Sequence, residues 1–238
     1  MNTRDHYVDI DTNLPGGTIL RRYLDLPKYI DLLRTGGLYL QRADKFSDRF
    51  EGALTPLLRK AIDAAHKTKE INYNANEFYQ RCRMCSYVSC WSLGANDNMA
   101  LWQLYGGAST SVAITTTAKR LTIACLQWNE NVIIKKVDYI DHFKNPDMVI
   151  GFSTDMLQFK HEAYEFEREV RILVPRKKDG WQNNPEAIKL PLYNLNDVIR
   201  SIVVAPAAEQ WFFDLIVDVT RRYNVNATVK RSKLSYLP

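Results

Sequence analysis

The sequence lacks the features that mark several classes of protein. None of its 238 residues form a run of about 18 apolar side chains, so no membrane-spanning helix is predicted. The N-terminal stretch MNTRDHYVDIDTN is polar and has no apolar segment of a secretory signal. Neither GxGxxG nor GxxxxGK followed by Ser or Thr occurs, which excludes the two common phosphate-binding loops. We therefore expect a soluble, cytoplasmic protein.

Cysteine is scarce and does not suggest a disulfide framework. The chain has 4 cysteines in 238 residues, without an export signal. Cys82, Cys85 and Cys90 are close in sequence, but a zinc site needs a fourth ligand, and the four histidines lie far from them. No βαβ pattern accompanies the CxxC, so a redox dithiol is not favoured either. We predict buried free thiols and no metal site.

The composition is that of a globular protein with a mild positive charge. Hydrophobic residues make up 46% of the chain and charged residues 25%, with a net charge of +5. We predict a single domain over residues 1–238, with a polar leader at 1–16 and a helical insertion at 54–86. The charge favours an anionic ligand or a nucleic acid without requiring either. The basic residues are scattered, and most are expected to be solvated.

Residue patterns predict an α+β fold, with strands that do not alternate regularly with helices. The expected sheet is mixed or antiparallel, with flanking helices. Strands are predicted at 18–26, 38–43, 86–93, 111–116, 132–140, 165–173, 201–205 and 226–234. Helices are predicted at 27–37, 54–86, 96–107, 119–124, 147–164 and 209–223.

The stretch EFEREVRIL is the most unusual of these strands. In a strand, Glu165, Glu167, Glu169 and Arg171 all lie on one face. A solvated strand face carries such residues without any function. However, glutamate is depleted in strands, and neighbouring carboxylates repel each other, which is a common way to shift a pKa at a site. Both interpretations stay open from this stretch alone.

The loop DKFSDRFEG also combines aromatic and charged residues between regular elements. Such loops often carry binding residues, which makes Arg42, Phe46, Asp48 and Glu51 candidates for a site. The structural alternatives are that Asp48 and Glu51 cap the following helix, or that Arg42 forms ion pairs with Asp44 and Asp48.

Several motifs together resemble a bacterial family. They are RYLDLPKYIDLLRTGGLYLQRADKFSDRFEG, VSCWSLGANDNMALWQLYGG, SVAI, FEREVRI and the closing SIVVAPAA and VKRSKL. Nearly the whole chain is covered, and the pattern resembles the family labelled domain of unknown function 2971. That label implies no activity.

The order of elements also resembles, more loosely, the ADP-ribosyltransferase-like fold with its split sheet. Enzymes of that fold have an Arg or His on a first strand, a Ser or Tyr on a middle strand and a catalytic Glu on a late strand. Here RRYLD supplies Arg22 or Arg21, SCWS supplies Ser89 or Ser92, and FEREV supplies the glutamates. The resemblance implies NAD as substrate and a macromolecular acceptor, protein or nucleic acid. A toxin or phage-defence role would suit such chemistry.

The resemblance also implies a role for each residue. Glu169 would stabilise the positive charge that builds up on the ribose, and Glu167 would orient or activate the acceptor. Arg171 would keep both glutamates ionised. NAD would be held by Arg22 at the pyrophosphate, Ser92 at a ribose, and the aromatic residues Tyr23, Trp91, Trp102 and Tyr105. As a structural alternative, these aromatic residues belong to the core.

Two other functions remain open. The predicted middle strand SYVSCWSL has no Ser-Thr-Ser motif, so the chain could be a non-catalytic module that binds a nucleotide or a protein through DKFSDRFEG. It could also be a metal-dependent nuclease built on the acidic strand face. Nuclease metals are usually held by residues from several elements, which counts against the second alternative.

Overall fold

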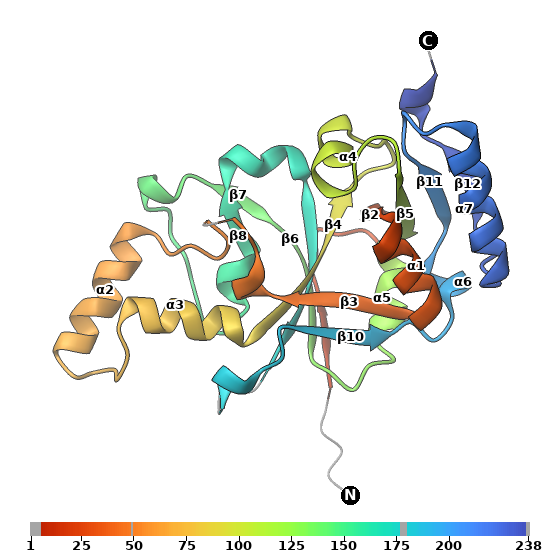
Figure 1. Ribbon diagram of the computed structural model, residues 1–238. Coiled ribbons are helices and arrows are strands. Elements are labelled where there is room, and N and C mark those ends of the chain that lie inside the picture. Colours follow the sequence, from red (N-terminus) through yellow and green to blue (C-terminus); the bar gives the residue numbers. More distant parts are fainter. Residues whose placement is uncertain (1–5, 49, 177–179, 237–238) are drawn as a thin grey trace, which may run out of the picture. The chain divides into compact units, whose positions relative to one another are not determined.

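Two units divide the chain, and each consists of segments that are far apart in sequence. In this computed structural model, residues 6–48, 50–176 and 180–236 are described. Figure 1 shows the elements. Unit 1 comprises Met1–Asp9, Leu40–Ser89 and Glu130–Ile188, and unit 2 comprises Ile10–Tyr39, Cys90–Asn129 and Lys189–Pro238. The boundary falls inside strands β1 (Val8–Ile10), β3 (Gly37–Arg42), β4 (Ser86–Leu93) and β10 (Ala187–Pro191).

Unit 2 contains a mixed sheet. Its strand order is β4-β2-β5-β11-β12. The pairs β4–β2, β2–β5 and β5–β11 are antiparallel, and β11 runs parallel to β12. The strands are β2 (Ile19–Asp25), β5 (Ser111–Thr117), β11 (Ser201–Val204), β12 (Thr228–Arg231) and the second half of β4. Their register places one row of buried apolar side chains on a single face: Leu20, Leu24, Val112, Ile114, Ile202 and Val204.

Helices pack on this sheet. α1 and α4 pack on β2, α5 on β5 and α7 on β12 (Figure 1). Local signals fix the ends of the first helix. Asp25 caps its N-terminus by accepting from the N–H of Lys28, and Gly36 ends it in a left-handed conformation with φ of 58°. The helices of unit 2 are α1 (Leu26–Thr35), α4 (Met99–Tyr105), α5 (Ala118–Cys125), α6 (Leu195–Val198) and α7 (Gln210–Arg222), followed by the 3-10 turn η6 (Lys233–Ser235).

Unit 1 holds a second group of paired strands. The order is β1-β6-β9 followed by the first half of β4, which also pairs with β3, and β3 pairs with β10. β7 and β8 form a separate parallel pair. The strands are β1 (Val8–Ile10), β6 (Val132–Lys136), β7 (Asp138–Ile140), β8 (Phe159–His161) and β9 (Glu169–Pro175).

The remaining elements of unit 1 are helices and short 3-10 turns. Helices α2 (Pro56–Lys67) and α3 (Ala75–Met84) pack on each other and lie within the predicted insertion at 54–86. The 3-10 turns are η1 (Ala43–Lys45), η2 (His142–Lys144), η3 (Asp155–Gln158), η4 (Glu162–Glu167) and η5 (Trp181–Asn183).

The predicted fold class is confirmed, but the predicted helix at 147–164 and the first part of the predicted strand at 165–173 are wrong. Mixed strand pairing and flanking helices make the chain α+β. The predicted helix at 147–164 is wrong, because this stretch contains an irregular segment, η3, β8 and the start of η4. Asp155 explains part of the difference: its side chain accepts from the N–H groups of Gly151 and Phe152 and closes a turn.

The structure bears on the predictions of a polar leader and of no membrane-spanning helix. The predicted polar leader at 1–16 includes strand β1, while residues 1–5 lie outside the described residues. Within the described ranges, no helix combines the length and the apolar character needed to cross a bilayer. The prediction of a single domain stays a prediction.

Candidate functional site

The glutamate-rich stretch does not form one continuous strand, which corrects the sequence prediction. Residues up to Glu167 belong to the 3-10 turn η4, and strand β9 begins only at Glu169. Between them Arg168 adopts a left-handed conformation with φ of 48°, and its N–H donates to the carbonyl of Glu165. The turn leaves Glu165 exposed and buries Glu167, so the predicted row of carboxylates on one face does not exist.

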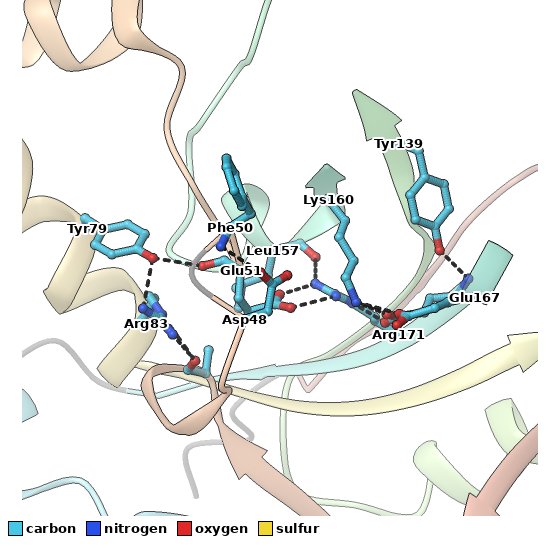
Figure 2. A network of polar contacts seen from close by, with 12 residues as sticks. Asp48, Phe50, Glu51, Tyr79, Arg83, Tyr139, Leu157, Lys160, Glu167 and Arg171 are labelled. Carbon is cyan, nitrogen blue, oxygen red and sulfur yellow. Dashed lines mark hydrogen bonds and ion pairs between the residues drawn. The ribbon is translucent and has the colours of Figure 1, made fainter. Parts of the chain in front are cut away.

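Glu167 and Glu169 nevertheless meet, through a cation that the sequence analysis did not consider. Lys160 Nζ on β8 lies 2.5 Å from Glu167 Oε2 and 2.7 Å from Glu169 Oε1. The other oxygen of Glu169 accepts from Arg171 Nε at 2.7 Å. Figure 2 shows Lys160 and Arg171 beside Glu167 in this network. Glu169 thus has one cation on each oxygen.

Arg171 extends the network to the loop DKFSDRFEG. Its Nη1 and Nη2 donate to the two oxygens of Glu51, the second at 3.0 Å, and Nη1 also donates to the carbonyl of Leu157 at 2.7 Å (Figure 2). Such a two-point contact fixes the orientation of both planar groups. Glu51 is therefore a member of the cluster and not a cap of the following helix, which Thr55 caps.

All five charged side chains are buried. Their exposed fractions are 1% for Glu51 and Arg171, 3% for Glu167, and 5% for Lys160 and Glu169. Buried charges are tolerated only when they are paired and hydrogen-bonded. With every group ionised, three carboxylates face two cations, which leaves one excess negative charge.

This excess separates the pKa values of the two neighbouring acids. Burial and the adjacent Glu169 raise the pKa of Glu167 to about 7. Burial also acts on Glu169, but Arg171 and Lys160 outweigh it and hold the pKa of that carboxyl well below its usual range. Burial disfavours the charged form of Lys160, yet the two glutamates raise its pKa. At neutral pH one acid is ionised and the other is half-protonated.

The loop that carries Glu51 is held by helix α3. Tyr79 donates from its hydroxyl to the carbonyl of Glu51 at 3.2 Å, and Arg83 Nη2 donates to the carbonyl of Ala43 at 2.9 Å. Gly52 follows with φ of 68°, and a Cβ there would lie 3.0 Å from Leu157 Cδ2. The backbone on both sides of Glu51 is thus fixed.

The other loop candidates have structural contacts. Arg42 is buried and its Nε donates to Asp44 Oδ1 at 2.6 Å, which is the predicted ion pair. Asp48 Oδ1 accepts from the N–H of Phe50 at 2.8 Å and stabilises a turn. Phe46 is half-buried at the end of η1.

In unit 2, strand β2 places the two candidate arginines on opposite faces. Arg21 pairs in register with Ser92 of β4, is 3% exposed and donates from Nη2 to the carbonyl of Ala95 at 2.7 Å. Its Nε and Nη1 have no hydrogen-bond partner within the described part of the chain. Arg22 Nη2 donates to the carbonyl of Tyr39 at 3.0 Å, and burial lowers its pKa to about 10.

The aromatic candidates of unit 2 differ in exposure. Tyr23 and Trp102 are buried and stack edge to face with ring centroids 4.8 Å apart. The indole N–H of Trp102 donates to Asp97, and Trp91 is also buried. Tyr105 is 44% exposed. Trp91 and Trp102 thus lie in the core, as the structural alternative held.

Sequence reasoning missed Lys160 and Tyr139. The hydroxyl oxygen of Tyr139 on β7 accepts a hydrogen bond from the N–H of Glu169 at 2.8 Å, which fixes the first residue of β9 (Figure 2). A lone lysine inside a stretch predicted as helix carries no signal of its own, and pairing between β7 and β8 is not visible in the residue pattern.

The described ranges contain no group of three or more His, Cys, Asp or Glu residues arranged to hold a metal ion. The three carboxylates of the cluster do converge, but Lys160 and Arg171 occupy the positions between them.

Comparisons with known proteins give limited information. No protein-family model matches the chain, so the resemblance to domain of unknown function 2971 stays a prediction. No curated protein matches it in sequence.

Among solved structures, the chain is similar in fold to DarT of Thermus sp. 2.9. The complex with ADP-ribosylated ssDNA is 12% identical at a TM-score of 0.44, covering 93% of this chain and 96% of that one. The complex with carba-NAD+ is 11% identical at 0.43, covering 92% and 97%, and the complex with NAD+ is 11% identical at 0.40, covering 94% and 100%. Such low identities and TM-scores do not transfer a function.

Proposed function

We propose that this protein cleaves the nicotinamide–ribose bond of NAD and transfers ADP-ribose to a macromolecular acceptor or to water. The observation that carries the proposal is the pair Glu167 and Glu169, two adjacent buried carboxylates whose pKa values lie on opposite sides of the ordinary value. Two acids with separated pKa values can take different roles in one reaction. The order of the arginine, serine and glutamate motifs in the sequence supports the same chemistry.

The reaction assigns one role to each acid. The bond between ribose C1′ and the nicotinamide nitrogen breaks, and its electron pair leaves with nicotinamide. Glu169, ionised beside Arg171, stabilises the positive charge that develops on the ribose. The acceptor then forms its bond to C1′ and gives its proton to Glu167, whose pKa of about 7 suits a general base.

The burial of Glu169 adds a condition to this proposal. Its carboxylate is 5% exposed and both of its oxygens are paired. A direct contact with ribose therefore requires the side chains around it to open when NAD binds. Closure over the bound substrate would then exclude water and strengthen the electrostatic contribution.

The residues expected to hold NAD belong to unit 2. Their role is proposed independently of the roles of Glu167 and Glu169. Arg21 is a better candidate than Arg22 for the pyrophosphate, because two of its nitrogen atoms have no partner within the described residues. A buried guanidinium with unused donors favours an anionic ligand. The exposed ring of Tyr105 is available for stacking, whereas Trp91 and Trp102 contribute to the core.

A second candidate function is a non-catalytic binding module. The observation that favours it is the complete pairing of Glu169 by Lys160 and Arg171, which is also what a purely structural cluster requires. A metal-dependent nuclease is disfavoured because two cationic side chains stand where a metal would have to bind.

Nicotinamide release from NAD tests these alternatives. The purified protein is assayed alone, with nucleic acid and with protein acceptors, and with and without a chelator. We expect chelator-independent release that falls by about 100-fold or more in Glu169→Gln, because a charge-stabilising group of this kind contributes that much. Glu165→Gln is the matched control, since Glu165 is exposed two residues before Glu167.

Three outcomes separate the candidates. Full activity in both Glu167→Gln and Glu169→Gln contradicts the assignment of the acids. No release by the folded wild-type protein with any acceptor favours the binding module. Release that needs no acceptor identifies an NAD hydrolase, and release that needs one identifies a transferase.

A further inference from the structure

The ammonium group of Lys160 makes three contacts. Two are the hydrogen bonds to Glu167 Oε2 and Glu169 Oε1, at 2.5 and 2.7 Å. The third is with the ring of Tyr164, whose centroid lies 4.6 Å from Nζ. A cation over an aromatic face is attracted by the ring, most strongly where water is excluded. The side chain of Lys160 is 6% exposed, so all three contacts are sheltered from water.

The position of these residues makes Lys160 the link between two segments. Lys160 lies on β8, whereas Glu167 ends η4 and Glu169 begins β9, with the left-handed Arg168 between them. The two carboxylates come from different elements and would repel each other if both were ionised. The ammonium group between them is what permits them to lie side by side.

We propose that Lys160 is a positioning residue, which holds the carboxylates of Glu167 and Glu169 together and limits them to one shared proton. This inference deepens the proposed function, since these two acids are its catalytic groups. Lys160 touches neither of the reacting atoms in that scheme and acts only through the acids.

Other groups also face the pair and contribute to its titration. Arg171 on β9 bonds to Glu169, and Tyr139 on β7 accepts from the N–H of Glu169. The ring of Tyr164 on η4 contacts Lys160. From the loop, Glu51 contacts Arg171, and Asp48 forms a hydrogen bond with Tyr164. Lys160 Nζ bonds to both glutamates. Its removal is therefore expected to change the shared proton more than loss of a single neighbour of one acid.

Carbon NMR of the protein labelled with 13C at the glutamate carboxyl groups tests this without any assay of NAD. Glu167 is assigned by the signal lost in Glu167→Gln, and its midpoint is measured between pH 4 and 9. In Lys160→Met we expect that midpoint to rise by about one pKa unit or more, because a positive charge in direct contact is lost. Lys160→Arg keeps the charge and should keep the midpoint near the wild-type value. Lys60→Met, at an exposed lysine of α2, should leave it unchanged.

An unchanged Glu167 midpoint in Lys160→Met overturns the proposal. Lys160→Gln is the second variant if the methionine protein does not fold. If neither variant folds, the wild-type protein is measured instead. The 15Nζ signal of Lys160 should then shift with the same midpoint as Glu167, and a different midpoint contradicts the proposal.

Activity distinguishes this inference from the function on which it rests. If the wild-type protein releases nicotinamide, the pH of half-maximal rate should rise in Lys160→Met by the same amount as the NMR midpoint and return in Lys160→Arg. A purely structural role would lower the rate without moving its pH profile. If the wild type releases no nicotinamide but the midpoint moves, the proposed function fails and the role of Lys160 stands.

Discussion

Arg171 in unit 1 and Arg21 in unit 2 are both buried, and the two arginines are paired very differently. Arg171 in unit 1 is 1% exposed and donates from all three of its nitrogen atoms, to two carboxylates and a carbonyl. Arg21 in unit 2 is 3% exposed and donates to one carbonyl, with two nitrogen atoms unpartnered in the described part of the chain.

The difference indicates which arginine is available to a ligand. Leaving buried donors without partners destabilises a folded protein, so such groups call for an explanation. The donors of Arg171 are used within the protein, and its charge sets the ionisation of Glu169. Two of the three nitrogen atoms of Arg21 have no partner in the described part of the chain. Burial lowers the pKa of Arg21, although Tyr23 and Asp97 act in the opposite direction. Arg171 thus holds the carboxylate cluster together, whereas Nε and Nη1 of Arg21 are the atoms that we propose for contact with a ligand.

The largest expected effect comes from breaking the better-paired arginine. Arg171→Met leaves Glu51 and Glu169 buried with the charge of one cation lost, and we expect a loss of about 3–5 kcal/mol in the free energy of unfolding. Denaturant titration near neutral pH measures it. Arg168→Met removes an exposed arginine three residues away and is the control. A loss below about 1 kcal/mol would show that the network contributes little.

A smaller effect is expected from titrating the unit 1 network. The pKa of Glu167 is raised from 4.5 to about 7, so between these pH values the folded protein keeps a proton that the unfolded chain releases. The contribution of Glu167 to stability is therefore complete below pH 4.5 and is lost as the pH rises to about 7. The loss is on the order of 3 kcal/mol.

Denaturant titrations at several pH values in this window measure the slope. Glu167→Gln should remove most of it, whereas Arg21→Met in the other unit should retain it. Glu169 acts in a different window: its pKa is lowered, so its contribution is present above 4.5 and is lost only as the pH falls further. A slope that persists in Glu167→Gln would assign the proton to another group.

The smallest effect on stability is expected at Arg21. Arg21→Met exchanges one hydrogen bond and a poorly paired buried charge for an apolar side chain, so we expect a change within about 1 kcal/mol. Binding should respond more strongly, with NAD affinity reduced by about tenfold or more. Isothermal titration calorimetry measures it, and Arg22→Met, on the opposite face, is the matched control. Equal losses in the two variants would contradict the distinction between them.

The sequence predicted those elements whose signals are local. Strand β4 was predicted at the residues where it lies, because a run of β-branched and aromatic residues needs no distant partner to be recognised. Helix α1 was predicted from a Pro near its start and a Gly at its end. The predicted helix at 147–164 failed because side-chain turns such as that of Asp155 compete with helical hydrogen bonds.

Four of the five charged residues in the cluster were named from the sequence, but their geometry was not. The loop composition singled out Glu51, and the charge pattern together with the resemblance singled out Glu167, Glu169 and Arg171; the structure brings all four into one cluster. The pairing of Glu51 with Arg171 spans 120 residues, and no local pattern encodes it. The break at Arg168 was missed because alternating charges favour a strand, whereas the buried ion pairs decide where the turn falls.

The interleaving of the two units has a consequence for how the chain folds during synthesis. Unit 1 draws its last segment from Glu130–Ile188, and unit 2 draws its first from Ile10–Tyr39. On the ribosome, early strands of unit 2 must therefore wait while most of unit 1 is made, and contacts between such distant segments form slowly. Neither unit can be obtained by simple truncation, because every cut removes strands from one unit or both. A split of this protein into separately expressed halves should yield fragments that are stable only when recombined.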